Sequence, residues 1–462
     1  MGNRVALHNL GCKVNAYEIE AMQQLLEEAG YEIVPFEPGA DIYVINTCTV
    51  TNIADRKSRQ MLHKAKKMNP EAIVVATGCY VQTGGDKLEK DEAIDLVLGN
   101  NQKINIVEAL AEYAENKPGH GSHVIKINQT KEYEDLSIDH TAEHVRAYIK
   151  VQDGCNQFCT YCIIPYARGR VRSRNIESVL KEVHSLAEKG YKEVVLTGIH
   201  LSSYGVDFPE EKKETLLSLI RAVHEIEGIQ RIRLGSLEPG IVTREFAEGI
   251  AALPKVCPHF HLSLQSGCDE TLERMNRRYR SGEYRERCEL LREVYGNPAL
   301  TTDVIVGFPQ ESEEEFQKSY DFVDGIHFYE THIFKYSRRQ GTKAAAMDGQ
   351  LTEAEKARRS EKMIEMHHRH ASDYEKSMIG KELEVLIEEE YTNDGRTWYL
   401  GHSREYIKTA VPKSENYGVN DIIRVKAERF LEDHIMTVEV VKDSAESYVD
   451  SLYSQSALNL RL

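Results

Sequence analysis

The chain alternates predicted strands and helices in two separate blocks, and this pattern constrains its fold more than any other feature. In the first block we expect strands at 4–10, 41–49, 72–80 and 94–98, with helices at 15–29 and 54–68. Parallel strands need a long crossover connection, usually a helix, so this alternation predicts a parallel sheet with helices on both faces. We therefore expect residues 1–115 to form an open parallel α/β domain.

Each of the first three predicted strands ends at a cysteine, namely Cys12, Cys48 and Cys79. The carboxyl ends of parallel strands form one crevice in an open α/β sheet, so these residues can meet in space although they are far apart in sequence. Three buried thiols are the alternative, because free cysteine is a common core residue. Core positions could fall anywhere along a strand, however, so the shared position favours a three-cysteine metal site.

The second block follows a less regular linker at 116–143. Its expected strands are 147–152, 193–197, 231–234, 259–264, 300–306 and 326–334, with helical stretches between them. Six such units predict a partial (β/α)6 barrel over residues 144–372. In barrels of this kind the active groups lie at the carboxyl ends of the strands.

A Cys-x3-Cys-x2-Cys loop, formed by Cys155, Cys159 and Cys162, follows the first strand of this block. Three thiolates from one loop can hold three irons of a 4Fe-4S cluster and leave the fourth iron open for chemistry. Zinc sites normally have four ligands, and the nearest other candidates are His144 and His184. The spacing therefore favours the cluster, with a zinc knuckle or three incidental thiols as alternatives.

This loop resembles that of the radical S-adenosylmethionine (SAM) enzymes. The resemblance implies that the open iron chelates SAM, which an electron from the cluster splits into methionine and a 5'-deoxyadenosyl radical. Tyr161 would then pack against the adenine of SAM, although a core aromatic is the alternative. The same resemblance makes Glu238 and Gln265 candidates for polar SAM contacts and Gly307 a point of close backbone approach.

The segment after the fifth barrel strand departs from the family pattern. It reads Gly-Phe-Pro-Gln-Glu where the family usually has Gly-Phe-Pro-Gly-Glu, so Gln310 takes a glycine position. We expect Gln310 to be strained if this turn needs a positive φ.

Residues 9–18 and 46–52 resemble the N-terminal domain of the methylthiotransferases, and the similarity to that family extends over about residues 3–441. It implies that Cys12, Cys48 and Cys79 hold an auxiliary 4Fe-4S cluster. It also implies a transferase that uses two SAM molecules to place a methylthio group on C2 of an adenine. The motifs look most like the branch acting on N6-threonylcarbamoyladenosine at tRNA position 37, next to the anticodon. Isopentenyladenosine in tRNA and a ribosomal protein side chain are the alternative substrates.

The region 373–441 changes to five short predicted strands, which suggests a small antiparallel β-barrel of the OB-like kind. It resembles the TRAM domain, which binds RNA in this family. The region is acidic, with 15 Asp and Glu against 9 Lys and Arg, which argues against a nonspecific grip on phosphates. Residues 442–462, rich in Ser and Tyr, are expected to form a flexible tail.

The distribution of charge along the chain indicates whether the protein can bind a nucleic acid. The net charge of −16 argues against a polyanion, but basic runs follow the cysteine loop and the fourth barrel strand. Arginine forks with interleaved tyrosine suit phosphate contact and base stacking, so we predict RNA contacts there, with solvated charge as the alternative. The predicted RNA-binding residues are Arg168, Arg170, Arg172, Arg174, Arg277, Arg278 and Arg280.

The sequence also predicts where the protein is located and which partners it has. No apolar run is long enough to span a membrane, and the first residues lack the apolar core of a signal peptide. Nine cysteines in such a chain indicate metal ligation or free thiols, because disulfides are rare in the cytosol. We therefore expect a cytoplasmic protein without a membrane partner. The family resemblance implies a tRNA anticodon loop and a flavodoxin or ferredoxin type electron donor as partners. An RNA-binding protein with structural metal sites is the non-enzyme alternative. Cys257, Cys268 and Cys288 lie outside the predicted sites, and we expect them to be inert thiols. We expect His367, His368 and His370 to lie on a solvated face of a helix.

Overall fold

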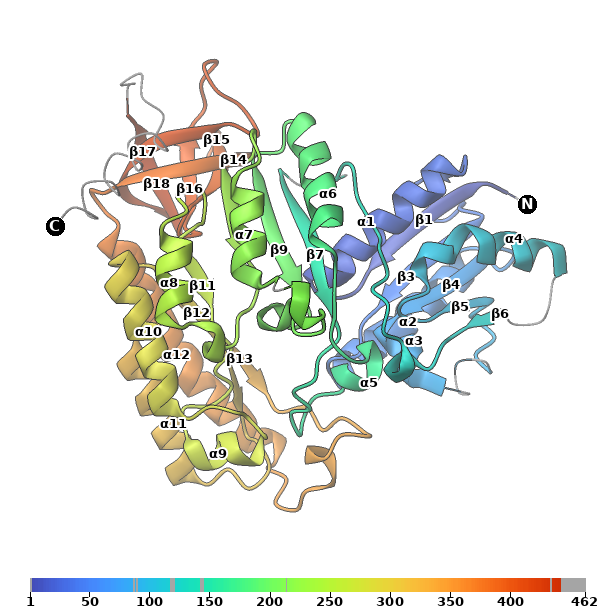
Figure 1. Cartoon of the computed structure of the whole chain (residues 1–462), viewed down its shortest axis with the longest axis horizontal. Coiled ribbons are helices and arrows are strands. Elements are labelled where there is room, and N and C mark those ends of the chain that lie inside the picture. The colour runs from blue at the N-terminus through green and yellow to red at the C-terminus, as the bar shows by residue number, and fades with distance from the viewer. Residues whose placement is uncertain are drawn as a thin grey trace.

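The computed structural model describes residues 2–85, 88, 90–116, 121–141, 145–212, 214–432 and 434–441, and it contains three successive parts (Figure 1). The predicted tail, 442–462, lies outside the described residues. No helix in the described ranges is long and apolar enough to span a bilayer.

The N-terminal part is a six-stranded parallel sheet in the order β2-β1-β3-β4-β5-β6. The open parallel α/β fold predicted for this region is confirmed. The short edge strands β2 and β6 were not predicted, and β6 lies within the expected linker. The strands are β1 (Arg4–Asn9), β2 (Glu32–Ile33), β3 (Ile42–Thr47), β4 (Ile73–Gly78), β5 (Leu96–Leu98) and β6 (Gly121–His123), and the helices are α1 (Lys13–Glu28), α2 (Asn52–Met68), α3 (Cys79–Gly84) and α4 (Ile106–Asn116).

The middle part carries six parallel strands in chain order, as predicted for a partial barrel. They form two sheets, β10-β9-β7 and β11-β12-β13, which isolated parallel bridges connect between β10 and β11. β8 (Arg172–Ser173) pairs antiparallel with β7 at the edge. The strands are β7 (Arg146–Asp153), β9 (Glu193–Gly198), β10 (Arg231–Leu234), β11 (His259–His261), β12 (Ala299–Val306) and β13 (Glu330–Lys335).

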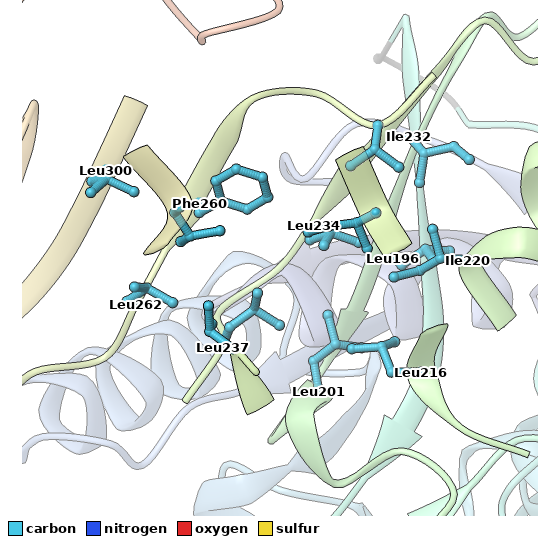
Figure 2. Close-up of a cluster of buried hydrophobic side chains, with 14 of the residues drawn as sticks. Leu196, Leu201, Leu216, Ile220, Ile232, Leu234, Leu237, Phe260, Leu262 and Leu300 are labelled. Carbon is cyan, nitrogen blue, oxygen red and sulfur yellow. The ribbon is translucent and has the colours of Figure 1, made fainter. Parts of the chain in front are cut away.

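Helices cover the outer face of these strands (Figure 1). The largest hydrophobic core lies between the strands and the helices, and Figure 2 shows part of it, including Leu196, Ile232, Phe260 and Leu300. Because side chains alternate along a strand, the residues between these positions face the inside of the barrel. The helices are α5 (Ile164–Arg168), α6 (Ile176–Glu188), α7 (Leu216–His224), α8 (Arg244–Ala251), α9 (Asp269–Arg274), α10 (Ser281–Tyr295), α11 (Glu313–Ile326) and α12 (Glu353–Ser377).

The C-terminal part is a closed five-stranded barrel in the order β14-β15-β16-β18-β17. All its pairs are antiparallel except β16 with β18. Closure removes exposed sheet edges, and the strands enclose an apolar core that includes Val385, Ile387, Val411 and Val425. The strands are β14 (Glu382–Asn393), β15 (Arg396–Ser403), β16 (Lys408–Pro412), β17 (Ile422–Glu432) and β18 (Ile435–Val440).

The predicted solvated face of α12 is wrong for two of its three histidines. His370 is buried with its Nε2 2.9 Å from Asp324 Oδ1, and His367 is half-buried against β13. Only His368 is exposed. The helix needs a wide buried face because it packs along β13 as well as against α11. Cys257, Cys268 and Cys288 are buried and free, as expected.

Candidate functional site

The first three cysteines lie at one edge of the N-terminal sheet. Cys12 caps α1 directly after the end of β1, Cys48 follows β3, and Cys79 opens α3 at the end of β4. β1, β3 and β4 are neighbours in the sheet, so the sequence argument about strand ends holds. Burial, together with the nearby charges of Cys79 and Cys12, raises the pKa of Cys48 to about 11. A nearby cation favours the thiolate form of such a thiol.

Arg168 supplies such a cation. Its Nε donates to Cys79 Sγ at 3.2 Å, and its Nη2 donates to Asn15 Oδ1 at 2.6 Å. Asn100 Nδ2 lies 3.6 Å from the same sulfur. Hydrogen bonds to ligand sulfurs tune the reduction potential of an iron-sulfur cluster. The surroundings of Cys79 therefore suit a thiolate ligand.

Arg168 is also part of a buried charge network that joins the two α/β parts. Glu18 on α1 is fully buried and accepts hydrogen bonds from Arg168, from Lys103 at 2.7 Å and from Lys150 at 2.7 Å. Burial would raise the pKa of Glu18, but the three cations outweigh it and hold that pKa well below its usual range. Asp153, at the end of β7, pairs with Lys150 at 2.7 Å. The network fixes α1 and the cysteine edge against the barrel.

The second cysteine set lies in the loop after β7. Cys155 and Cys159 are buried and Cys162 is half-buried. Burial raises the pKa of Cys155 to about 11 and that of Cys162 to about 12. Arg277 Nη1 donates to Cys159 Sγ at 3.3 Å, so this set, like the first, receives one buried arginine.

The spacing of the sulfurs can be compared with that required by a single metal ion. Zinc binds thiolates at about 2.3 Å, so two sulfurs on one ion lie at most about 4.6 Å apart. Neither cysteine set is among the groups of described residues whose ligand atoms all lie within 4.8 Å of one another. Among the described residues, neither set therefore has the compact spacing of a site for a single ion.

Glu238 lies beside the cysteine loop, at the carboxyl end of β10. It accepts hydrogen bonds from Gln157 Nε2 at 2.9 Å, and it lies 3.1 Å from both His200 Nε2 and Arg277 Nη2. Burial opposes ionisation, but the His200 hydrogen bond and the Arg277 charge lower the pKa of Glu238. A cavity of about 440 Å³ opens at Gln157, His200 and Glu238 and extends to α7 and α8.

The other predicted SAM residues have mixed surroundings. Tyr161 is half-buried and packs edge-on against Phe308, with ring centroids 6.3 Å apart, beside a small apolar cluster. Gln265 has φ +72° at the end of β11. A Cβ at Gly307 would lie 2.4 Å from Lys356 Cγ, so the close approach there is by a lysine side chain.

The turn after Gly307 contains the strained residue expected from the sequence. Gln310 has φ +65°, a conformation that favours glycine. The next residue, Glu311, holds the turn, because its Oε2 accepts from the backbone of Gly307 and Phe308 at 2.9 and 3.0 Å. Arg359 pairs with the other oxygen of Glu311 at 2.8 Å. The expected strain at Gln310 is confirmed.

Most of the first arginine run does not face RNA. Arg168, Arg172 and Arg174 are fully buried, so their predicted RNA contacts are wrong. Arg174 pairs with Glu182, and Arg172 donates to the backbone carbonyls of Arg168 and Arg170 at 3.0 Å. Their partners come from segments that the local sequence does not reveal. The exposed members of the predicted set are Arg170, Arg278 and Arg280, whereas Arg277 is mostly buried beside Cys159.

The sequence analysis missed Glu18 and Arg339. Glu18 interrupts the apolar face formed by Val14, Tyr17 and Ala21, and a buried acid at that spacing was a usable signal. Arg339 connects the segment after β13 to the N-terminal part, because its Nη1 lies 2.6 Å from Asp55 Oδ2. No pattern around Arg339 indicates this contact.

Family comparisons agree with this arrangement. Residues 4–99 match the family described as "Uncharacterized protein family UPF0004", and residues 149–323 match the "Radical SAM superfamily". Among solved structures, the radical SAM methyltransferase TsrM from Kitasatospora setae has a TM-score of 0.55 at 18% identity, covering 72% of this chain and 75% of that one. That likeness concerns the fold alone.

Curated relatives cover nearly the whole chain. The Bacillus subtilis "Threonylcarbamoyladenosine tRNA methylthiotransferase MtaB" is 40% identical over 91% of this chain and 93% of the relative. Its Aquifex aeolicus counterpart is 44% identical over 84% of this chain and 93% of the relative. A "tRNA-2-methylthio-N(6)-dimethylallyladenosine synthase" from Finegoldia magna is 35% identical over 88% of both chains. The chain therefore belongs to the radical SAM methylthiotransferase family.

Proposed function

We propose that this protein is a tRNA methylthiotransferase that converts N6-threonylcarbamoyladenosine next to the anticodon to its 2-methylthio derivative. The observation that carries the proposal is the pair of three-cysteine sets, each with an arginine that donates to one of its sulfurs, Arg168 at Cys79 and Arg277 at Cys159. The choice of substrate is supported by the relatives of 40 and 44% identity that are named for it. A dimethylallyladenosine substrate is the second candidate, supported by the relative of 35% identity.

We assign one 4Fe-4S cluster to Cys12, Cys48 and Cys79 and another to Cys155, Cys159 and Cys162. With SAM bound, these groups would supply reductive SAM cleavage at one site and the methylthio sulfur at the other. The protein's own residues supply positive charge at both sites. Arg168 and Arg277 stabilise thiolates, and Glu238, held by His200 and Gln157, offers a fixed acceptor beside the second loop.

We further propose how the partners bind. We propose that Arg170, Arg278 and Arg280, which are exposed, contact tRNA phosphates. The closed C-terminal barrel has the OB-like architecture used on nucleic acids, so we assign it to the anticodon stem as a TRAM-like domain. A small flavoprotein or ferredoxin would supply the electron, in the cytoplasm.

The test is anaerobic reconstitution with iron and sulfide, followed by SAM, dithionite and tRNA that carries threonylcarbamoyladenosine without the methylthio group. Mass spectrometry of the nucleosides should detect replacement of one hydrogen by a methylthio group. Cys12→Ala should lose this product and keep SAM cleavage, while Cys288→Ala, a buried thiol outside both sites, should keep both. SAM cleavage by the unaltered protein without any change in the tRNA would contradict the proposed substrate.

A further inference from the structure

Two histidines and an aspartate lie together on three adjacent strands of the barrel. His261 ends β11, Asp303 lies on β12 and His332 on β13. The strand register places His261 opposite Thr301 and Asp303 opposite His332. Their sequence neighbours Phe260, Leu262 and Val304 belong to the outer core. By strand alternation, the three polar side chains therefore point to the inside of the barrel.

The spacing of these side chains is that of ligands on one ion. One ligand atom from each residue lies within 4.8 Å of the others. His261 Nε2 lies 3.2 Å from Asp303 Oδ2, yet it is buried without a hydrogen bond from the described residues. The two atoms are thus close but do not have the geometry of a hydrogen bond. Two ligands at about 2.1 Å and right angles around a metal are separated by about 3 Å, which is close to the 3.2 Å between these two atoms.

Thr301 fixes the orientation of the His261 ring. Its Oγ1 lies 2.9 Å from His261 Nδ1, on the strand position opposite His261. When Nδ1 donates to this hydroxyl, Nε2 carries the free lone pair that a metal requires. A metal-binding histidine typically has such a partner for its other ring nitrogen. His332 stacks nearly parallel to the His261 ring, with centroids 5.7 Å apart and an interplanar angle of 25°.

We infer that His261, Asp303 and His332 form a divalent metal site inside the barrel. Two imidazoles and one carboxylate favour late first-row ions such as Zn²⁺ and Co²⁺ over Mg²⁺ and Ca²⁺, which prefer oxygen ligands. Three ligands from one wall leave coordination positions open. Because His332 is exposed, the site is accessible from solvent, and its open positions can accept a carboxylate or hydroxyl oxygen from a bound molecule.

The inference is tested by anaerobic calorimetric titration of the cluster-loaded protein with Co²⁺ or Zn²⁺, since the clusters already contain iron. The variants are His332→Ala, which removes an exposed ligand, and Asp303→Asn, which keeps the shape of the side chain. His184→Ala on α6 removes an exposed histidine outside the site and serves as the matched control. Iron and sulfide contents are measured for each variant, so that cluster loss is distinguished from loss of this site.

The unaltered protein and His184→Ala should each bind about one equivalent of metal. His332→Ala and Asp303→Asn should bind it at least about tenfold more weakly with unchanged cluster content, by comparison with the 10–100-fold effect of removing a partner of a ligand. Equal affinity in all four proteins, or no binding by the unaltered protein, would overturn the metal site. Neither outcome depends on tRNA or on SAM cleavage.

Discussion

Arg168 lies with its Nε 3.2 Å from Cys79 Sγ, although it belongs to the helix that follows the other cysteine loop. One side chain thus connects the Cys155–Cys162 loop to the edge of the N-terminal sheet. The same guanidinium pairs with Glu18 and lies 3.3 Å from Asp153 Oδ2. The relative position of the two cysteine sites is therefore set by buried charge, and not only by the connecting segment.

Replacing Arg168 should disrupt both the charge network and the first cysteine site. Arg168→Ala leaves Glu18 and Asp153 buried with one cation fewer, and breaking a buried pair in this way costs about 3–5 kcal/mol. We expect a lower Tm and loss of roughly half of the bound iron, since iron-sulfur content follows its ligand environment. Arg170→Ala, two residues along and exposed, is the control. Equal Tm and iron content in the two variants would contradict this role.

Arg277 should tune the second site. It donates to Cys159 Sγ and pairs with Glu238, so Arg277→Met removes both a hydrogen bond to sulfur and a nearby positive charge. Both losses disfavour the reduced, more negative cluster, so its reduction potential should fall. The measurement is a redox titration followed by electron paramagnetic resonance. Arg278→Met, on the exposed neighbour, should leave the potential unchanged.

The sequence predicted the parts of the site that depend on local pattern. Cys12, Cys48 and Cys79 were placed together because the strand–helix alternation already implied parallel strands, and strand ends in such sheets share an edge. The Cys155–Cys162 loop could be predicted because its three cysteines lie within one short segment. Gln310 was identified because it takes the position where the family usually has glycine, and its φ of +65° agrees with the strain expected there.

The roles of the arginines depend on contacts between distant segments. Arg168 meets Glu18 across 150 positions, and Arg233 on β10 pairs with Glu193 on β9 at 3.1 Å. A charge run looks the same in sequence whether it is solvated, bound to RNA or buried against acids. The grouping of His261, Asp303 and His332 could not be predicted either, because these residues share no motif and are brought together only by the strand register.

The exposed arginines should contribute to tRNA affinity. Arg278→Glu combined with Arg280→Glu removes two phosphate-binding charges and adds repulsion, so the Kd for tRNA should rise about tenfold or more and depend less on salt. SAM cleavage without tRNA should not change. Arg221→Glu on α7, exposed on another surface, is the control, and fluorescence anisotropy at several salt concentrations is the measurement. An equal loss of affinity in the control would indicate a general charge effect.

Gln310→Gly should stabilise the turn after β12. A non-glycine residue in the left-handed region costs about 1–2 kcal/mol, and glycine removes that cost but adds chain entropy to the unfolded state. The substitution also removes only one long hydrogen bond, which Gln310 Nε2 donates to Asp348 O at 3.4 Å. We expect a net gain below about 1 kcal/mol, visible as a small rise in Tm by calorimetry. Gln317→Gly, within α11, should lower the Tm.

His367 should make the protein sensitive to mild acid. Its Nδ1 accepts the backbone N–H of Thr331 at 3.3 Å, which only a neutral imidazole can do at that nitrogen, and burial next to other histidines lowers its pKa from 6.5 to about 4. The unfolded chain therefore takes up a proton as pH falls through 6.5 while the folded chain does not, so stability declines between pH 6.5 and 4 and not further below. Thermal unfolding at pH 7.5, 6 and 5 should show a steeper fall in Tm for the unaltered protein than for His367→Gln, whose amide oxygen can still accept the Thr331 hydrogen bond. His368→Gln, on the exposed neighbour, should retain the steeper fall, and parallel pH profiles for all three proteins would exclude His367 as the source.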